Sequence, residues 1–525
     1  MTSSLHLMDL LFRFVPKHLT YNIVAFFPRT GVGVQFFRPI ASDVFRAAAH
    51  SGSTRACPFA QVARSATVKI MAEKTNFQKR LADALDTVGY EVVASGTPLR
   101  LHSHCAGMDA VSTSIRKLGI RAKVVATESD PAAATFHMMH HCKTHHLVAD
   151  IKWVAEGVCG PCFTHGGKMC TWDPKCDLLF SSFVCKPYSR ANGKRIKTMA
   201  VDVGSDPHGV DTYHHTKTAI ARYHPSAFVL ENVDGVTTPH PVDDSAGSTS
   251  RKRKMAPSPA DFMLADLKDV GYNVIMLPSI KASETAGMCQ SRPRTLFFGV
   301  RHGQAATVES VVHLFKTMSN AYKGLGVRDH IDDFLNTTDD NDVGEDVPPG
   351  SEVHGVDALF EYVPEYKKAR DVLLTVFPEK DMPMVDTKDR PSASVPTEKA
   401  RVRATIDILI HIHKMHTTDC SGSPGCRCHP LADVSQRADR AKWHVDGSIP
   451  TLTTGSKIFS YKLRRLLTPL ELLRSMGYDK KCSLVPFPAT TARTMVGNGY
   501  CVPVCAMAVA AAASVVGRIA PKIRT

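Results

Sequence analysis

Short apolar runs alternate with helical or polar stretches between residues 95 and 300. The runs are 123–126, 177–180, 227–230, 273–277 and 295–300. Continuous apolar runs of this kind, separated by helices, are typical of parallel strands that are buried on both faces of a sheet. The pattern therefore predicts an α/β, Rossmann-like fold, in which helices cover both faces of a mostly parallel, doubly wound sheet.

Two helices are predicted outside this region. Residues 71–90 have the mixed apolar and polar spacing of a surface helix. Residues 502–517 form the most apolar run of the chain, which is rich in alanine and has Pro503 near its start. This run is shorter than the roughly 18 residues that a membrane span needs, so we expect a buried helix and no membrane segment.

The charge and the cysteine usage narrow the class of protein. A formal net charge of +14 favours polyanionic partners, nucleic acid first, although a basic tail that inflates the count is an alternative. The 15 cysteines of this 525-residue chain lack the dense, even spacing of a disulfide scaffold. We therefore expect a reducing compartment, in which cysteines are free for chemistry or for metal binding.

A thiol, a carboxylate and two guanidinium groups follow one another beside predicted strands. Cys185 and Glu231 each come at the end of an apolar run, and Arg292 and Arg294 lead into another. Doubly wound sheets bind ligands at the carboxyl ends of their strands. Each residue alone also has a structural interpretation, as a buried cysteine, a surface acid or a solvated arginine, but the ordered set indicates one chemical site.

This ordered set resembles the cytosine C5 methyltransferase family, over about residues 99–515. The matching segments are Val184-Cys185-Lys186 for the family's Pro-Cys-Gln, Glu231-Asn232-Val233 for Glu-Asn-Val, 290–294 for Gln-x-Arg-x-Arg, 450–453 for Pro-Thr-Leu-Thr, 465–471 for Arg-x-Leu-Thr-x-x-Glu, and 497–503 for Gly-Asn-x-(x)-Val-Pro with one or two extra residues. Single motifs are weak signals, whereas their order along the chain is specific. The resemblance implies a methyltransferase fold with a C-terminal helix that packs back on the catalytic domain.

The resemblance also implies a role for each residue of the set. Cys185 is the nucleophile that attacks C6 of a cytosine, and Glu231 supplies a proton or a hydrogen bond to N3 of the ring. Arg292 and Arg294 hold the carbonyl oxygen of the base and the carboxylate with planar donors. Lys186 stands where the family has Gln, and it either lowers the pKa of the thiol or points to phosphate or solvent. C5 lies inside the base stack of a duplex, so the cytosine has to be flipped out.

S-adenosylmethionine is the cofactor that the resemblance implies. The family's glycine-rich turn corresponds to residues 103–110, which keep only Gly107 and have Asp109 and Ala110 in place of a glycine pair. Asp and Ala adopt a positive φ less readily than Gly, so this departure predicts weakened cofactor binding. The predicted cofactor-binding residues are Cys105, Ala106, Gly107, Glu128, Ser129, Asp150, Ile151 and Asn498.

Two acids in this set have specific expected roles. Glu128 follows a predicted strand and is expected to bind the ribose hydroxyls, as an acid at this place does in related sheets. Asp150, with Ile151, is expected to contact the adenine. For both acids the alternative is an ordinary helix cap.

Two groups of residues have the chemistry of zinc ligands. The first comprises Cys159, Cys162, Cys170 and Cys176. The second comprises Cys420, Cys426, Cys428 and His429. Four such side chains can close a structural zinc site, although neither spacing matches that of a standard zinc finger.

The predicted organisation has four parts. They are a transit-like or disordered extension (1–70), a catalytic and cofactor-binding domain (71–300) with a flexible insertion at about 235–260, a target-recognition region with flexible loops (301–480), and a C-terminal segment that completes the catalytic domain (481–525). The alternative for residues 1–70 is that Met71 is the true start of the protein.

DNA is the expected substrate, and two alternatives stay open. The branch of the family that methylates tRNA carries Cys-Phe-Thr, which occurs here at 162–164 but before the nucleophile. A nucleic-acid-binding relative without catalysis would explain the glycine-poor turn. The basic stretch 251–254 resembles a nuclear import signal, whereas residues 1–70 would suit delivery to an organelle.

Overall fold

The structure is a computed structural model, and it describes residues 76–141, 144–189, 210–241, 255–325, 331–335, 402, 405, 406, 409, 429–436 and 441–523. The chain divides into two units, Met1–Ala66 and Thr67–Thr525. The first unit, the basic stretch 251–254 and most of the second cysteine group lie outside the described residues. All that follows concerns the second unit.

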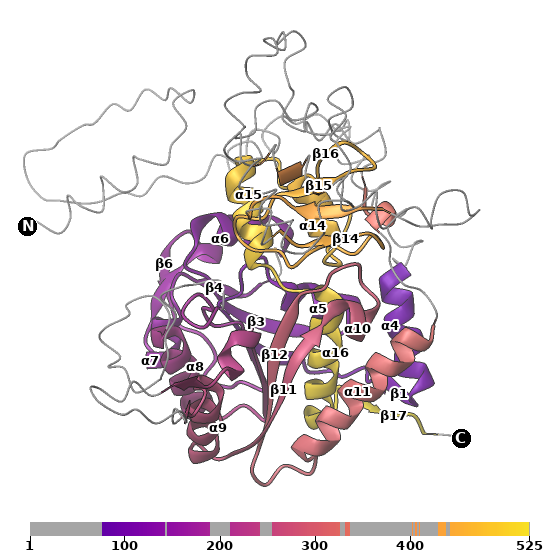
Figure 1. The fold of residues 1–525 in the computed structure, drawn as a ribbon. Helices are drawn as coiled ribbons and strands as arrows, with labels where there is room; N and C mark the ends of the chain where they lie inside the picture. Colours follow the sequence, from indigo (N-terminus) through magenta and orange to yellow (C-terminus); the bar gives the residue numbers. More distant parts are fainter. Residues whose placement is uncertain are drawn as a thin grey trace, which may run out of the picture. The chain divides into compact units, whose positions relative to one another are not determined.

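A nine-stranded sheet is the centre of this unit (Figure 1). Its strands, in order across the sheet, are β11 (Tyr272–Lys281), β12 (Pro293–Arg301), β8 (Ala227–Val233), β7 (Leu178–Ser181), β2 (Leu99–His104), β3 (Ala122–Thr127), β4 (His146–Val148), β5 (Gly160–Cys162) and β6 (Lys168–Cys170). The five strands from β8 to β4 are parallel, and β12, β5 and β6 are antiparallel to their neighbours. The prediction of a mostly parallel sheet is confirmed.

The order of the strands reverses between β2 and β7. From β2 the chain proceeds outward through β3 and β4, and it then returns to place β7 and β8 on the other side of β2. The carboxyl ends of β2 and β7 therefore flank a crevice, which is the usual ligand site of a doubly wound sheet. Cys105 follows β2 and Cys185 follows β7, so both predicted sites begin at this crevice.

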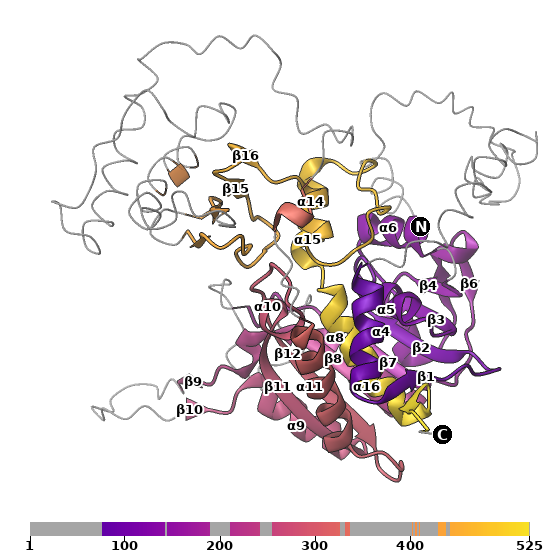
Figure 2. The ribbon, with the colours of Figure 1, turned by 90° about the vertical axis from the view of Figure 1, so that its right-hand side faces the viewer.

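Successive residues of the central strands face two separate cores. In β7, Phe180 belongs to one core and Leu179 to the other, and in β8 Val229 and Leu230 alternate in the same way. Helices α4 (Asn76–Thr87), α5 (Ala110–Leu118), α11 (Val308–Gly324) and α16 (Val502–Ala513) cover the first core, whereas α7 (Ile151–Glu156), α8 (Val210–Tyr223) and α9 (Pro259–Asp269) cover the second (Figures 1 and 2). Burial on both faces explains why these strands are continuous apolar runs.

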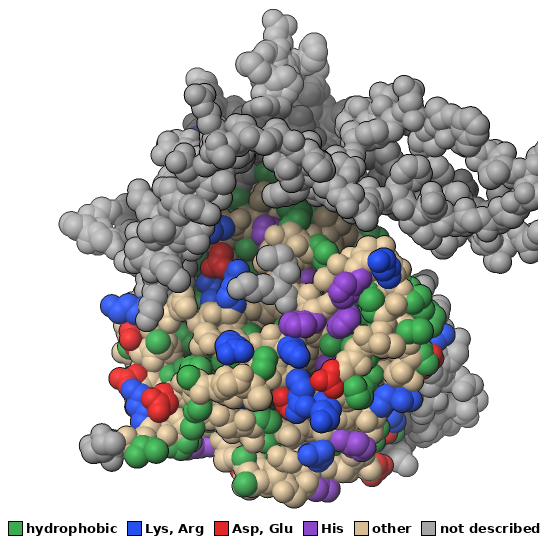
Figure 3. Space-filling model, turned by 180° about the vertical axis from the view of Figure 1, so that it is seen from behind, with side chains coloured by type: hydrophobic (Ala, Val, Ile, Leu, Met, Phe, Trp, Pro, Cys, Tyr) green, Lys and Arg blue, Asp and Glu red, His purple; other side chains and the backbone are tan. Residues whose placement is uncertain are grey.

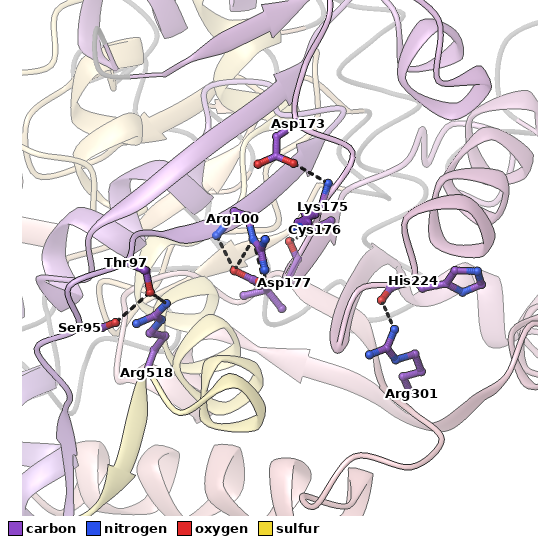
Figure 4. A network of polar contacts seen from close by, with 11 residues as sticks. Ser95, Thr97, Arg100, Asp173, Lys175, Cys176, Asp177, His224, Arg301 and Arg518 are labelled. Atoms are coloured by element: carbon purple, nitrogen blue, oxygen red, sulfur yellow. Dashed lines mark hydrogen bonds and ion pairs between the residues drawn. The ribbon is translucent and has the colours of Figure 1, made fainter.

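An ion pair fixes the amino ends of β2 and β7 (Figure 4). The Asp177 carboxylate accepts the backbone N–H of Arg100 at 2.9 Å and pairs with the guanidinium of the same residue. Asp177 comes directly before β7, so its side chain sets the register of β7 against β2. This network lies at the opposite ends of the strands from Cys105 and Cys185.

All twelve residues of α16 are buried. Its backbone is tied to α5, because the Ser114 hydroxyl donates to the Val502 carbonyl at 3.2 Å. Within the described residues one helical stretch, Ala489–Val516, has the length and apolarity of a membrane span, but 83% of its most apolar window is buried inside the protein. Helices that are buried in the core of a protein pass the same test of length and apolarity.

Two predicted boundaries differ from the structure. Helix α11 follows residue 301 but packs against α4 and α16, so it belongs with the large sheet and not with a recognition region. The predicted insertion at 235–260 begins and ends in a two-stranded ribbon of β9 (His240–Pro241) and β10 (Met255–Ala256), and α9 already starts at Pro259. The apolar residues of α11 recur at helical spacing, but this spacing alone does not indicate which sheet the helix covers.

A second, smaller sheet lies in the later part of the chain. Its antiparallel strands are β14 (Trp443–His444), β13 (Leu431–Asp433), β15 (Ile458–Ser460) and β16 (Arg465–Leu466). Phe459 is the largest fully buried side chain of its own small core. Helices α14 (Pro469–Arg474) and α15 (Ala489–Asn498) follow it and lead into α16 (Figure 2).

Candidate active site

Cys185 lies in a tight turn that follows β7. The backbone N–H of Tyr188 donates to the Cys185 carbonyl at 3.0 Å, and the backbone N–H of Val184 donates to the Thr212 hydroxyl at 3.1 Å. The Cys185 side chain is half-buried, and Lys186 beside it is exposed. The turn therefore presents the sulfur at the carboxyl end of the sheet.

Asn232 joins this turn to the neighbouring strand. Its side-chain amide donates to the backbone carbonyl of Phe183 at 3.0 Å, and its side-chain oxygen accepts the backbone N–H of Val233 at 2.8 Å. Asn232 is fully buried. The middle residue of the Glu-Asn-Val motif thus links the nucleophile turn to β8, which carries Glu231.

Glu231 and Arg294 form a buried ion pair across β8 and β12. The Arg294 Nε atom lies 2.6 Å from Glu231 Oε1. Arg294 is paired in register with Val233, so Glu231 and Arg294 are diagonal neighbours on one face of the antiparallel pair. A charge-assisted hydrogen bond of this length fixes the direction of the carboxylate.

Arg292 reaches the same space from the residue before β12. Its Nη2 donates to the Gly497 carbonyl at 2.7 Å, whereas its Nε and Nη1 are buried and have no hydrogen-bond partner among the described residues. Burial lowers the pKa of Arg292 to about 9, and the charge of Arg294 acts in the same direction. Buried donors without partners are costly, so this guanidinium has the character of a ligand site.

The charged groups of β8 and of the start of β12 act on the Cys185 thiol. Burial raises the pKa of the Cys185 thiol, the charge of Arg294 opposes this rise, and the charge of Glu231 adds to it. Arg292 also opposes the rise. The charges of Glu231, Arg292 and Arg294 thus all act on the Cys185 thiol.

Later motifs hold Arg292 in place. The backbone N–H of Ile449 donates to the Cys289 carbonyl at 2.5 Å, and the Thr451 hydroxyl donates to the Ser291 carbonyl at 2.7 Å. The 450–453 motif is thereby docked on the segment that precedes β12. A Cβ atom at Gly497 would collide with the backbone carbonyl of Thr453, so only glycine allows this approach.

The 465–471 motif stabilises the fold and does not enter the site. Arg465 forms a bidentate pair with Glu471, at 2.8 and 2.7 Å. Thr468 and Glu471 cap the first turn of α14 reciprocally. Glu471 is fully buried, so this pair orders the approach to α14 and α15.

The predicted cofactor turn connects β2 to α5 and has three residues with positive φ. They are Cys105, Gly107 and Asp109, with φ values of 50°, 55° and 50°. Asp109 tolerates this conformation because its carboxylate caps α5, where it accepts the backbone N–H of Ser112 at 3.0 Å. The same carboxylate lies 3.5 Å from His137 Nε2. Asp109 is therefore built into the fold where the family has glycine.

Glu128 closes this turn from the end of β3. Its carboxylate accepts the backbone N–H of Gly107 at 2.6 Å and that of Asp130 at 2.8 Å. Burial raises the pKa of Glu128. Burial also raises the pKa of the Cys105 thiol, and the charges of Glu128 and Asp150 add to this effect. Both acids thus act on one space beside the turn.

The space beside Gly107 is open, because nothing lies within 4 Å of a Cβ atom built there. A backbone turn with free space in front of it, flanked by acids from two strands, fits an adenosyl ligand with ribose hydroxyls. Gly499 lies against the turn, since a Cβ atom at this position would be 2.7 Å from the Met108 methyl group. Asn498 is exposed and directly precedes Gly499.

The remaining predicted cofactor residues differ in exposure. Asp150 caps α7 by accepting the backbone N–H of Lys152 at 2.9 Å, and Ile151 is 95% buried and offers little surface to a ligand. Ala106 is half-buried and Ser129 is exposed. Asp150 is thus a helix cap in the structure. One of its carboxylate oxygens accepts the capping bond, and the other can still contact a ligand.

The family model described as "C-5 cytosine-specific DNA methylase" matches residues 99–513 of this chain. The chain belongs to this family. Cytosine C5 methylation with S-adenosylmethionine is the activity that the family implies. The sequence of this methylase has no match among the curated proteins.

Among solved structures, the methylase is similar to three methyltransferases. The S. pombe Dnmt2 methyltransferase is 12% identical, with a TM-score of 0.39, over 79% of this chain and 98% of that one. A DNMT2 mutant from Spodoptera frugiperda is 14% identical, with a TM-score of 0.37, over 79% and 99%. The methyltransferase EhMeth of Entamoeba histolytica is 10% identical, with a TM-score of 0.36, over 80% and 98%.

Tyr500 is a residue of the methylase site that sequence reasoning missed. Its side chain is buried, and its hydroxyl has no hydrogen-bond partner among the described residues. Burial raises the pKa of Tyr500, and the charge of Glu231 adds to the rise. Tyr500 lies inside the 497–503 motif, and this position in the sequence could have indicated that it belongs to the site.

The first predicted metal group is divided in the structure. Cys162 and Cys170 lie with His146 and His165, and we call these four residues the edge cluster. Cys159 is exposed, and Cys176 is buried with its thiol directed at the Leu178 carbonyl at 3.2 Å. In the second group, His429 bonds to Asp332 and Ser460, and its three cysteines lie outside the described residues.

Proposed function

We propose that this methylase is a DNA (cytosine-5)-methyltransferase that acts on an extruded cytosine through a covalent adduct with Cys185. The convergence of the Cys185 sulfur, the Glu231 carboxylate and the partly unpartnered Arg292 guanidinium carries this proposal. The family description and the net charge of +14 support DNA as the substrate.

Each of these groups has a chemical part in the adduct. The Cys185 thiolate adds to C6 of the ring and forms a C–S bond, while Glu231 donates a proton or a hydrogen bond at N3, where the ring electrons accumulate. Addition at C6 makes C5 nucleophilic. S-adenosylmethionine, when bound, supplies the electrophilic methyl group for C5. Loss of the C5 proton and of the C–S bond then restores the aromatic ring and the thiol.

The arginines orient the reacting groups. Arg292 has two buried N–H donors that can bond to the carbonyl oxygen of the base, which would satisfy donors that the described protein leaves without partners. Arg294 holds the Glu231 carboxylate by one oxygen, so that the other faces the base. A 1 Å displacement of either group would cost a large part of the rate.

The turn at 105–109 and the acids beside it would hold the cofactor. Glu128 already accepts two backbone N–H groups, but a carboxylate has about four acceptor positions, so ribose hydroxyls can be added without breaking these bonds. Asp150 follows β4 and Asn498 ends α15, so both come from segments that are distant from the turn in sequence. The Asp109 side chain, fixed by its cap and by His137, keeps the turn in the conformation that three positive φ values require.

The location of Cys162-Phe163-Thr164 supports DNA over tRNA. These residues belong to β5 and to the short helix η1 (Phe163–His165) at the far edge of the large sheet. Cys162 is part of the edge cluster, and the Thr164 hydroxyl accepts the backbone N–H of Leu147 at 3.0 Å. The tripeptide has local structural partners and does not belong to a recognition region.

Trapping with 5-fluorocytosine tests the proposal. Fluorine at C5 cannot leave as a cation, so the C–S adduct accumulates once the methyl group is on the ring. Duplex DNA and tRNA that carry 5-fluorocytosine are incubated with the full chain and labelled S-adenosylmethionine. We expect a labelled adduct with DNA, its loss in Cys185→Ala, and its retention in Cys159→Ser, which changes an exposed cysteine outside the site.

The other outcomes of this experiment contradict the proposal in distinguishable ways. An adduct with tRNA alone assigns the substrate to tRNA. No adduct with either nucleic acid, together with DNA binding and no heat of S-adenosylmethionine binding by calorimetry, identifies a binding protein without catalysis. An adduct that persists in Cys185→Ala removes Cys185 from the mechanism.

A further inference from the structure

The edge cluster lies at the border of the large sheet, away from the crevice between β2 and β7. Its residues come from four elements, namely His146 from β4, Cys162 from β5, His165 from η1 and Cys170 from β6. Their ligand atoms all lie within 4.8 Å of one another. Residues separated by up to 24 positions are thus brought to one point by the pairing of β4, β5 and β6.

The distances within the cluster match those between the ligands of a tetrahedral zinc ion. The Cys162 sulfur lies 3.2 Å from His165 Nδ1 and 3.8 Å from His146 Nδ1, and the Cys170 sulfur lies 3.3 Å from His165 Nδ1. Zinc–sulfur bonds of about 2.3 Å and zinc–nitrogen bonds of about 2.0–2.1 Å at tetrahedral angles place sulfur and nitrogen about 3.6 Å apart. We propose that the edge cluster binds one zinc ion in a four-coordinate, structural Cys2His2 site.

The local packing explains why a metal is needed here. Of residues 157–170, all of which are described, only Gly160 and Cys162 are buried. Met169 is 56% exposed and Phe163 is 39% exposed, so the apolar side chains of this segment do not form a core. Small segments without a core commonly depend on a metal or on a disulfide. A zinc ion would fasten the β5–β6 hairpin to β4.

The ligand chemistry favours zinc over other common ions. Two thiols and two imidazoles form a soft donor set, and the cluster contains no carboxylate, which calcium or magnesium would require. Four protein ligands leave no open position, as in structural sites and unlike catalytic ones. The protein therefore gains stability from this ion and not a second chemical centre.

The ion has a path from solvent. His165 is exposed, and His146 and Cys170 are partly exposed, whereas Cys162 forms the buried side of the cluster. Figure 3 shows histidine side chains gathered on one face of the molecule, with basic and apolar side chains around them. The Thr164 hydroxyl accepts the Leu147 backbone N–H, and this bond orders η1 so that His165 turns toward β4.

The site has a consequence for the neighbouring crevice. Asp150 lies only two residues after the end of β4. The backbone N–H of Ala149, between them, donates to the Pro161 carbonyl at 3.1 Å. The hairpin that zinc would fasten is therefore in direct contact with the segment that presents Asp150. Fixing this edge of the sheet would fix the position of that acid.

Metal content of matched variants tests the site. The full chain is purified without chelators, and zinc is measured by inductively coupled plasma mass spectrometry. We expect about one zinc per chain in the wild type and in Cys159→Ser and Cys176→Ala, since neither cysteine belongs to the cluster, and a loss of most of this zinc in Cys162→Ser and His165→Asn. The Cys159 and Cys176 variants separate this site from one built of the four cysteines.

X-ray absorption of the wild-type protein gives an answer even where a ligand variant fails to fold. Two sulfur and two nitrogen neighbours around zinc are expected, and cobalt in place of zinc should show the intense visible bands of a tetrahedral site. Zinc that is lost from Cys159→Ser but kept in His165→Asn overturns the proposal. A zinc-free wild type whose mass is two hydrogens lower, with Cys162 and Cys170 in one cross-linked peptide, overturns it in favour of a disulfide.

Discussion

The Asn232 side-chain amide donates a hydrogen bond to the backbone carbonyl of Phe183 at 3.0 Å, and this bond joins the two segments that carry the reacting groups. Glu231 lies one residue before Asn232, and Cys185 lies two residues after Phe183. The distance between nucleophile and acid is therefore controlled by a fully buried amide that touches neither.

Removal of this amide should lower both the stability of the fold and the rate of catalysis. Asn232→Ala leaves the Phe183 carbonyl buried without its donor, so we expect a loss of about 1–3 kcal/mol in the free energy of unfolding. The nucleophile turn also loses its anchor, and we expect the single-turnover methylation rate to fall at least about tenfold. Asn273→Ala, at an exposed position of β11, serves as the control and should change neither quantity. An unchanged single-turnover rate in Asn232→Ala would limit Asn232 to a structural role.

The charge of Arg294 should control the reactivity of Cys185. Burial raises the pKa of this thiol and Arg294 opposes the rise most strongly, so Arg294→Gln should raise the pKa further. The alkylation rate of Cys185 by iodoacetamide increases with pH as the thiolate forms, and we expect this profile to move to higher pH, with a rate at least about threefold lower at pH 8.

Peptide mass spectrometry follows the alkylation of Cys185, with exposed Cys159 as an internal reference. Arg294→Lys keeps the charge without the planar fork and should stay near the wild-type profile. Equal profiles for Arg294→Gln and the wild type would show that another cation governs the thiol.

Gly497 should not tolerate a methyl group. In Gly497→Ala the Cβ atom meets the Thr453 carbonyl, so the two backbones must separate, and Arg292 loses the geometry of its bond to the Gly497 carbonyl. We expect a loss of about 1–3 kcal/mol in the free energy of unfolding, measured with urea, together with weaker binding of DNA that contains cytosine. Gly455→Ala, two residues after Thr453 and with open space around its Cβ position, should stay within about 0.5 kcal/mol of the wild type. Equal stability of the two variants would contradict the close approach.

Buried histidines of β2 should make the fold sensitive to acid. Burial lowers the pKa of His102 to about 4, and both ring nitrogens lack hydrogen-bond partners among the described residues. The unfolded chain takes up a proton at its ordinary pKa of about 6.5, so stability is complete above pH 6.5 and decreases as the pH falls toward 4. The free energy of unfolding that protonation of His102 removes between pH 6.5 and pH 4 is about 3 kcal/mol.

His102→Phe should reduce this decrease, because phenylalanine keeps the contact with Tyr223 and cannot be protonated. Urea unfolding at several pH values between 4 and 7 measures the slope. His145→Gln, which changes an exposed histidine, should leave the slope unchanged. A wild-type slope in His102→Phe would assign the acid sensitivity to other groups, such as His104.

The strands that bury both faces in apolar residues could be predicted from the sequence, and β2 could not. β7, β8 and β12 are continuous apolar runs, because each residue meets one of two cores. In β2, Arg100, His102 and His104 alternate with Leu99, Leu101 and Ser103. Their environment depends on partners such as Asp177 and Tyr223 that come much later in the chain. Periodicity alone contains no information about such partners.

A similar limit applies to the candidate sites. Cys185, Glu231 and the two arginines could be proposed from the sequence, because their order along the chain resembles that of the cytosine C5 methyltransferase motifs. The edge cluster could not, since a pattern of cysteines alone points to Cys159 and Cys176, whereas the pairing of β4 with β5 brings His146 to Cys162. In the sequence, Asp109 departs from the family's glycine-rich turn. The structure shows that its side chain caps α5 and lies next to His137.

The complete burial of α16 determines when the protein can become active during synthesis. The ribosome makes the Cys185 turn about 330 residues before it finishes this helix, which at about 5–20 residues per second corresponds to tens of seconds. Until then the apolar face of α5 is open to solvent, and the Gly497 carbonyl that holds Arg292 does not yet exist. A nascent or prematurely terminated methylase therefore has its nucleophile but lacks the segment that positions its base-binding arginine, and it exposes a surface that chaperones and proteases recognise.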